Sequence, residues 1–110
     1  MNLNQDKVPT TLEEALDLLK QAMSPEEAAK VKVMKPAELH FSLGMFLRNE
    51  WSLWQEGNIL NTWFLKTYGV KHPDDISGII LECLINDMNG VPRRDKILAK
   101  QFIDHWKKQK

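Results

Sequence analysis

The chain has 110 residues, 43% of them hydrophobic and 27% charged, which suits one domain with a real apolar core and argues against disorder. The single cysteine, Cys83, excludes an intramolecular disulfide and a cysteine-rich zinc site, and it favours a reducing compartment. Residues 1–9 are polar, so we expect no signal peptide and no membrane span, and we predict a cytoplasmic protein.

The first half of the chain predicts three helices. Thr11 and Glu14 form a capping-box pattern ahead of apolar residues at helical spacing. Ser24, followed by proline and two glutamates, predicts the start of a short second helix that ends near Met34. Pro36 opens a third helix, with its apolar side marked by Leu39, Leu43, Phe46 and Leu47.

The second half predicts three more helices. One begins near Ile59 and stops at Gly69, a glycine suited to a helix C-terminus. The next begins at 72–75 and ends at 89–90, and its broad apolar face should make it the most buried helix. Pro92 opens the last helix, with an apolar stripe formed by Leu98, Phe102 and Trp106. We therefore predict an all-α fold, a compact bundle of five or six short helices without a sheet.

The predicted single domain spans residues 1–110, with a core at 10–90 and a basic C-terminal helix at 91–110. Residues 93–110 carry seven Lys/Arg and two acids, against eight bases and thirteen acids in the rest, so the two parts have charges of +5 and −5. Such a segment could contact nucleic acid, although a solvated helix face with cations near its C-terminus explains the same pattern.

A column of unusual residues lies on the third helix. His40, Gly44 and Arg48 are four apart and share one face. Glycine costs about 1 kcal/mol relative to alanine inside a helix, which predicts a close approach at Gly44 by another backbone or a ligand. Helix packing, with His40 and Arg48 satisfied by a neighbouring helix, is the simpler interpretation.

A second polar group begins the fifth helix at 72–77. Asp74 and Asp75 suit a helix start, where carboxylates accept free backbone N–H groups. Metal binding by His72 and the two aspartates, with His40 as a further donor, is the alternative, but no His or Cys pair supports it, and we predict no metal or other cofactor. We expect Arg48 to pair with Asp74 or Asp75 and so to lock the third helix against the start of the fifth.

Four tryptophans are many for this length. Most should be core residues, but Trp51 and Trp54 adjoin a predicted turn and are candidate anchors for a partner. Nucleophilic catalysis finds little support, because Cys83 falls on an apolar face and no phosphate-binding, dinucleotide-binding or serine-nucleophile motif is present.

Two segments together resemble a bacterial family of small domains of unknown function. The first runs from Leu39 to Trp54 as LHFSLGMFLRNEWSLW, and the second runs from His72 to Ser77 as HPDDIS. The resemblance extends from about Thr11 to Met88 and implies no activity or ligand. It implies a signature cluster made of His40, Gly44, Arg48, Asn49, His72, Asp74, Asp75 and Ser77, which forms either a structural clasp or a ligand site.

The leading prediction is a non-catalytic protein-interaction module of a bacterium or phage, such as an inhibitor, an immunity protein or an accessory subunit. Its partner would be another protein, and a homo-oligomer is compatible with the sequence. The alternative is a small ligand- or metal-binding domain or hydrolase that uses His40, Arg48, His72, Asp74 and Asp75, which requires these side chains to converge in a pocket. A third possibility is weak nucleic-acid binding through the basic C-terminal helix, with an affinity that falls steeply with salt.

Overall fold

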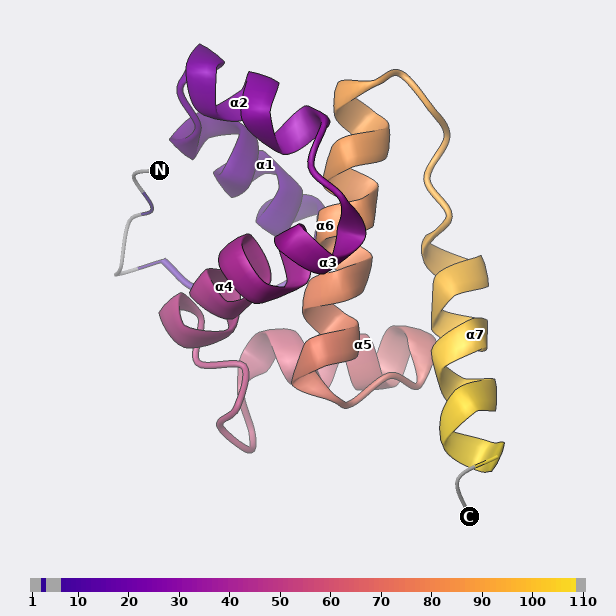
Figure 1. Ribbon diagram of the computed structural model, residues 1–110. Coiled ribbons are helices and arrows are strands. Elements are labelled where there is room, and N and C mark those ends of the chain that lie inside the picture. Colours follow the sequence, from indigo (N-terminus) through magenta and orange to yellow (C-terminus); the bar gives the residue numbers. More distant parts are fainter. Residues whose placement is uncertain (1–2, 4–6, 109–110) are drawn as a thin grey trace.

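A computed structural model describes residue 3 and residues 7–108 and shows an all-helical protein (Figure 1). These residues form six helical segments and no strand, because α3, η1 and α4 follow one another without a break. The radius of gyration is 13.4 Å, the size of a single compact domain of this length. The prediction of an all-α bundle is therefore confirmed.

The helices are bounded as follows: α1, Leu12–Ala22; α2, Pro25–Lys32; α3, Pro36–Leu39; the π-helical turn η1, His40–Gly44; α4, Met45–Glu50; α5, Ile59–Tyr68; α6, Pro73–Met88; and α7, Asp95–Lys108. No helix within the described ranges is long and apolar enough to cross a bilayer.

Local signals in the sequence determine most helix ends. Thr11 and Ser24 accept hydrogen bonds from backbone N–H groups three residues on, as N-caps do. The predicted capping box at Thr11 is incomplete, since the Glu14 carboxylate accepts from the Thr10 backbone instead. α5 ends at Gly69, as predicted, because its φ of +78° is the left-handed conformation that glycine adopts without strain.

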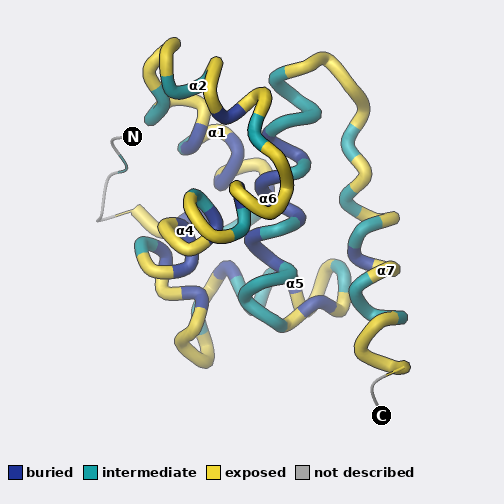
Figure 2. The backbone as a smooth tube through the Cα atoms, viewed as in Figure 1, coloured by how far each residue is buried: buried dark blue, intermediate teal, exposed yellow. Residues whose placement is uncertain are grey.

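α6 is the centre of the molecule (Figure 2). Seven of its residues are buried: Ile76, Ser77, Ile79, Ile80, Leu81, Cys83 and Leu84. The buried side of α1, formed by Leu12, Ala15, Leu16 and Leu19, belongs to the same apolar core. α6 is thus the most buried helix, as its broad apolar pattern predicts.

The segment at 36–50 differs from the single regular helix predicted for it. Its middle turn, η1, is π-helical, so the residues of α4 are rotated relative to a continuous α-helix. This rotation turns Leu47 and Arg48 inward, while Phe46 lies at the surface. The prediction that Phe46 belongs to the apolar side of this helix is therefore wrong.

α7 runs antiparallel to α6 and is joined to it by a long connection (Figure 1). It begins at Asp95 and not at Pro92, because Arg93 turns back toward Asp87 and Glu13. Its predicted apolar stripe is only partly covered: Ala99 is its buried residue, Leu98 and Phe102 are half-buried, and Trp106 is exposed.

Candidate functional site

Arg48 joins the 36–50 segment to the start of α6. It is buried, and its Nη1 donates to Ser77 Oγ at 2.8 Å while its Nη2 donates to the His40 carbonyl at 3.2 Å. Its Nε lies 3.3 Å from Asp74 Oδ1, an ion pair outside hydrogen-bond geometry. We call these four residues, His40, Arg48, Asp74 and Ser77, the Arg48 clasp. The predicted ion pair between Arg48 and an aspartate of the fifth helix is present.

Gly44 leaves the space that the guanidinium of Arg48 occupies. A Cβ atom built at Gly44 would lie 2.9 Å from Arg48 Nη1 and 3.1 Å from the Leu39 carbonyl oxygen. Both distances are shorter than ordinary van der Waals contact. The predicted close approach at Gly44 is therefore real, but the approaching group is a side chain of the same helical segment and not a second backbone.

The π turn contributes to the same arrangement. Residues 40–44 form it, and the His40 carbonyl oxygen at its start accepts the hydrogen bond from Arg48. π turns are rare and occur often at functional sites, which marks this turn as part of the candidate site.

The two tryptophans near the clasp have opposite environments. Trp51 is 2% exposed and belongs to the core, so the prediction that it anchors a partner is wrong. Trp54 is 58% exposed, and Arg48 Cζ lies 5.8 Å from the centroid of its ring, within cation–π range. A buried cation thus supports one face of an exposed indole ring.

His72 and Asp75 contact α7 and not Arg48. The His72 ring stacks on the Trp106 ring with centroids 5.2 Å apart, and Asp75 Oδ2 accepts a 2.7 Å hydrogen bond from Trp106 Nε1. His72 Nδ1 also accepts from the Asp74 backbone N–H, so His72 is the N-cap of α6. The expectation that an aspartate caps this helix is wrong, because the imidazole of His72, one residue before Pro73, accepts the hydrogen bond from the free N–H group of Asp74.

The signature cluster is therefore divided. Four of its members form the Arg48 clasp, and Gly44 leaves space for the guanidinium. His72 and Asp75 contact α7, and Asn49 lies at the surface. Four of them, His40, Asp74, Asp75 and Ser77, line a cavity of about 520 Å³ between α3–η1, α6 and α7. No group of three or more His, Cys, Asp or Glu side chains in the described part of the chain could hold a metal ion, so the metal alternative finds no ligand set there.

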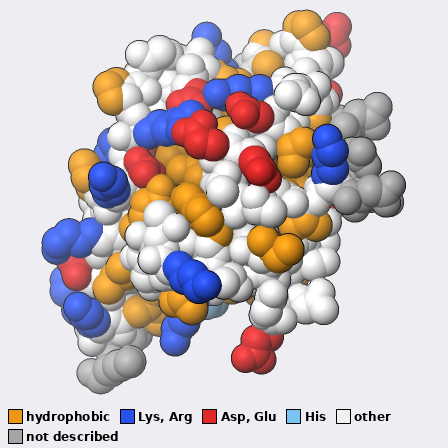
Figure 3. All heavy atoms as spheres, turned by 180° about the vertical axis from the view of Figure 1, so that it is seen from behind, with side chains coloured by type: hydrophobic (Ala, Val, Ile, Leu, Met, Phe, Trp, Pro, Cys, Tyr) orange, Lys and Arg blue, Asp and Glu red, His pale blue; other side chains and the backbone are white. Residues whose placement is uncertain are grey.

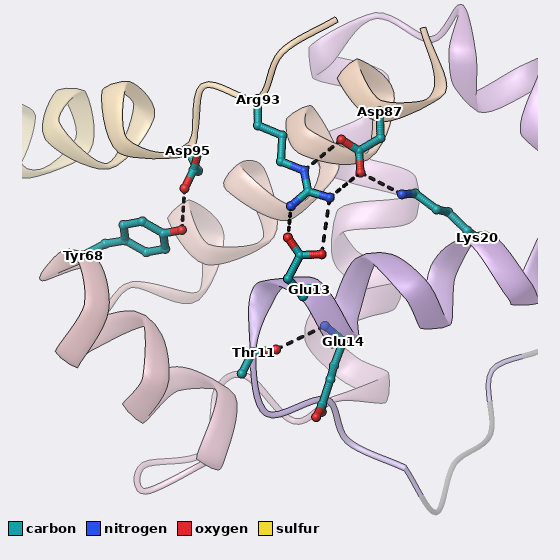
Figure 4. Close-up of polar contacts among 8 residues, drawn as sticks. All are labelled: Thr11, Glu13, Glu14, Lys20, Tyr68, Asp87, Arg93 and Asp95. Atoms are coloured by element: carbon teal, nitrogen blue, oxygen red, sulfur yellow. Dashed lines mark hydrogen bonds and ion pairs between the residues drawn. The ribbon is translucent and has the colours of Figure 1, made fainter. Parts of the chain in front are cut away.

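A charge network that the sequence does not predict holds the other end of α6. Arg93 donates from Nη2 to Asp87 Oδ2 at 2.7 Å and also contacts Glu13, while Lys20 Nζ lies 2.7 Å from the same Asp87 oxygen (Figure 4). The hydrogen bonds from Arg93 lower the pKa of Asp87 to about 2. The hydrogen bonds that Arg93 makes with Asp87 and Glu13 in turn raise the pKa of Arg93. Because Arg93 and Glu13 are 80 positions apart, no local pattern could have paired them.

Two further groups bear on chemistry. Burial raises the pKa of the Cys83 thiol to about 12, so this cysteine stays protonated at neutral pH and is a poor nucleophile. Tyr68 Oη donates a 2.6 Å hydrogen bond to Asp95, at the first residue of α7 (Figure 4). Burial and this bond raise the pKa of Tyr68, so it acts as a neutral donor that ties α7 to α5.

The comparisons with known proteins give a family and no function. No curated protein and no solved structure matches the chain. One family model matches residues 8–88, which include the clasp, Trp54 and all of α1–α6 but not α7. Since the match covers most of the 110 residues, the chain belongs to DUF6794, a domain of unknown function.

Proposed function

We propose that this chain is a non-catalytic protein-binding module that docks through the outer side of the 36–50 segment. The docking surface, which we call the aromatic face, consists of Phe41, Met45, Asn49 and Trp54. Phe41 is 70% exposed and Met45 48%. Exposed aromatic and methionine side chains are enriched in the cores of protein interfaces.

The members of the aromatic face are connected through the Arg48 clasp. Phe41, Met45 and Asn49 follow one another at intervals of four along the segment. The Phe41 ring contacts the His40 ring, and His40 in turn accepts a hydrogen bond from Arg48, over which Trp54 lies. The clasp thus holds two exposed aromatic rings in fixed positions, which reduces the entropy that binding would cost.

Charge around the aromatic face suggests the chemistry of its partner. Between residues 36 and 58 the charged side chains are Glu38, Glu50, Glu56 and Arg48, and Arg48 is buried and paired with Asp74. The exposed charge on this segment is therefore acidic. A partner protein with an apolar pocket surrounded by Lys or Arg would complement it, as an inhibited enzyme or the main subunit of a complex could.

The observation that carries this proposal is Trp54, an exposed indole ring held over a buried guanidinium. The test starts with affinity capture on the immobilised chain, followed by a measured Kd for the captured and identified protein. We expect Trp54→Ala to weaken binding by about thirtyfold, the loss of a 2 kcal/mol hot spot. Ile97→Ala is the matched control, because Ile97 is similarly exposed but lies on α7. Equal affinities of the wild type and Trp54→Ala for the partner would contradict the proposal.

The hydrolase alternative has less support. Arg48 already contacts Asp74, Ser77 and His40, so its guanidinium is not free for a substrate. His72 stacks on Trp106, away from this group. Of the five residues named for that activity, His40, Asp74 and Asp75 line one cavity, but Arg48 and His72 are not among its lining residues.

Nucleic-acid binding through residues 93–110 is the weakest proposal. Three of the six described bases in this segment are paired: Arg93 contacts Glu13 and Asp87, Arg94 lies 3.7 Å from Glu82, and Lys100 lies 2.8 Å from Asp104. Paired cations of this kind attract phosphate less than free ones.

A further inference from the structure

A second cavity lies between α7 and the stretch that joins α5 to α6. Its lining residues come from 69–75 and from 102–107, and its volume is about 520 Å³. This volume lies within the range of pockets that hold small organic molecules. We call it the Trp106 cavity. Because the family match ends at residue 88, one wall of this cavity belongs to the family domain and the other belongs to the helix that follows it.

Trp106 forms a fixed apolar wall of this cavity. Its ring is 45% exposed, yet its Nε1–H already donates to Asp75, and the His72 ring stacks on it. The indole is therefore held at two points, and its exposed part has no polar group left to satisfy. Phe102 and Ile103 line the same space. A ligand with a flat apolar body can pack there without first ordering the indole ring, which lowers the entropic cost of binding.

The charged groups of the Trp106 cavity favour an anion. Lys71 and Lys107 line it, and neither is paired with an acid among the described residues. Asp75 is the acid among the lining residues, and its Oδ2 already accepts a hydrogen bond from Trp106. Two lysines against one aspartate leave a net charge of +1, which suits a single carboxylate. Figure 3 shows the molecule from behind, where Lys and Arg side chains lie along the edge that α7 forms, beside hydrophobic ones.

His72 adds a neutral donor to the same cavity. Its Nδ1 accepts a hydrogen bond from the Asp74 backbone N–H, so the proton of the neutral imidazole is on Nε2. No described residue accepts a hydrogen bond from this Nε2–H, and His72 is one of the lining residues. The N-cap contact and the stack on Trp106 together fix the orientation of the ring, which leaves one oriented N–H for water or a ligand.

We propose that the Trp106 cavity binds a small organic anion, specifically an aromatic monocarboxylate. The ring of the ligand would pack against Trp106 and Phe102. Its carboxylate would accept hydrogen bonds from Lys71, Lys107 and the Nε2–H of His72, since one carboxylate can accept several donors at once. None of these residues belongs to the aromatic face, so this proposal and the proposed function can fail independently.

The test is an NMR titration of the full chain with 2-naphthoate, using 2-naphthylmethylamine as a cation of similar shape. We expect the anion to shift the indole N–H signal of Trp106 and the backbone amide signals of Gly69 and Ile103 at concentrations up to about 1 mM, a range suited to a small ligand. The amine should leave these signals in place. The double variant Lys71→Gln, Lys107→Gln should weaken naphthoate binding by about tenfold, because each exposed cation contributes modestly.

Two further variants complete the experiment. The double variant Lys66→Gln, Lys96→Gln is the matched control, since it removes the same charge from exposed positions outside the cavity, and it should bind naphthoate as the wild type does. Trp106→Ala should abolish detectable binding, and circular dichroism should show that it remains folded, because the side chain is exposed.

Four outcomes would overturn the proposal. They are equal binding of the anion and the amine, equal losses in the two double variants, naphthoate shifts confined to the signals of Phe41 and Trp54, and the same Trp106 shift with sodium acetate at equal concentration.

Discussion

At the scale of single residues, Gly44 and Arg48 depend on each other. The guanidinium can reach Ser77 and the His40 carbonyl only because no Cβ stands at Gly44. This contact accounts for a glycine in the middle of a helical segment, where its intrinsic propensity is poor. The same dependence makes the pair suitable for a double-mutant cycle.

We expect Gly44→Ala to lower the free energy of unfolding by about 1–3 kcal/mol, although alanine is the better helix former, because the added Cβ overpacks the site. In an Arg48→Ala background the cost should fall by about 1 kcal/mol or more, since the closest contact is gone. Urea denaturation of the four proteins measures both values.

Gly78→Ala is the control for this cycle. Gly78 also lies within a helix, but a Cβ there would meet Phe102 Cζ at 3.6 Å, an ordinary contact. The substitution should be neutral or stabilising by up to about 1 kcal/mol. If Gly44→Ala were also neutral, or if its cost did not depend on Arg48, the close packing described for Gly44 would be wrong.

The sequence predicted that Arg48 pairs with Asp74 or Asp75 because both segments follow local rules, and the structure shows that the partner is Asp74. Spacing by four placed His40, Gly44 and Arg48 on one side, and aspartates at a helix start are common. The division of the cluster could not be predicted, because His72 and Asp75 contact Trp106, which is about thirty residues away. The opposite environments of Trp51 and Trp54 depend on how the chain leaves α4, and composition does not encode that.

At the scale of elements, helix starts and stops were predicted where capping is local. Ser24, Gly69 and the end of α6 at Met88 agree with the sequence signals. The start of α7 was not predicted, because the Arg93 network and not a cap determines where the chain turns. The π turn was not predicted either, since helical periodicity alone gives no sign of it.

The Arg93 network should make the stability of the protein depend on acid. The pKa of Asp87 is about 2 in the folded protein, below its ordinary value of 3.8. A carboxylate with a lowered folded pKa stabilises the fold above its unfolded pKa and loses that contribution as the pH falls. The stabilisation from Asp87 should therefore be complete above about pH 5 and disappear between about pH 4 and pH 2.

We expect Asp87→Asn to be less stable than the wild type by about 1–2 kcal/mol at pH 7, a value reduced for solvent screening. The difference should disappear near pH 2 in urea denaturation curves. Asp104→Asn is the control, because the ion pair of Asp104 among the described residues is with the exposed Lys100 of the same helix, and its removal should change stability little at any pH. A difference for Asp87→Asn that persists at pH 2 would exclude this role.

At the scale of the whole molecule, the core lies inside the family match. Of the buried hydrophobic residues in the described chain, Ala99 is the one that comes after residue 88. α7 covers one side of α6 through half-buried contacts, and the Tyr68–Asp95 hydrogen bond ties it to α5. α7 thus contributes little to the buried core.

A chain that ends after Gly90 should still fold. We expect helical circular dichroism and cooperative urea unfolding, with a loss of about 3–5 kcal/mol, because the truncation removes the half-buried apolar contacts of α7 and also the ion pairs of Arg93. The matched comparison is a chain that ends after Leu84. This shorter chain lacks the last turn of α6 and should be unfolded. A fragment 1–90 without a cooperative transition would show that α7 is part of the folding unit.

The π turn also has a consequence for how the gene can change. A π turn holds one residue more than the α-helical turn that it replaces, so deletion of a single codon within 40–44 would leave a helix of ordinary geometry. Residues 36–39 and 45–50 would keep nearly the same orientation relative to each other, because the wide π turn already absorbs the extra residue that the deletion removes. Variation in length by one residue at this turn would therefore change the exposed side chains around Phe41, while leaving the helices on either side and the core in place.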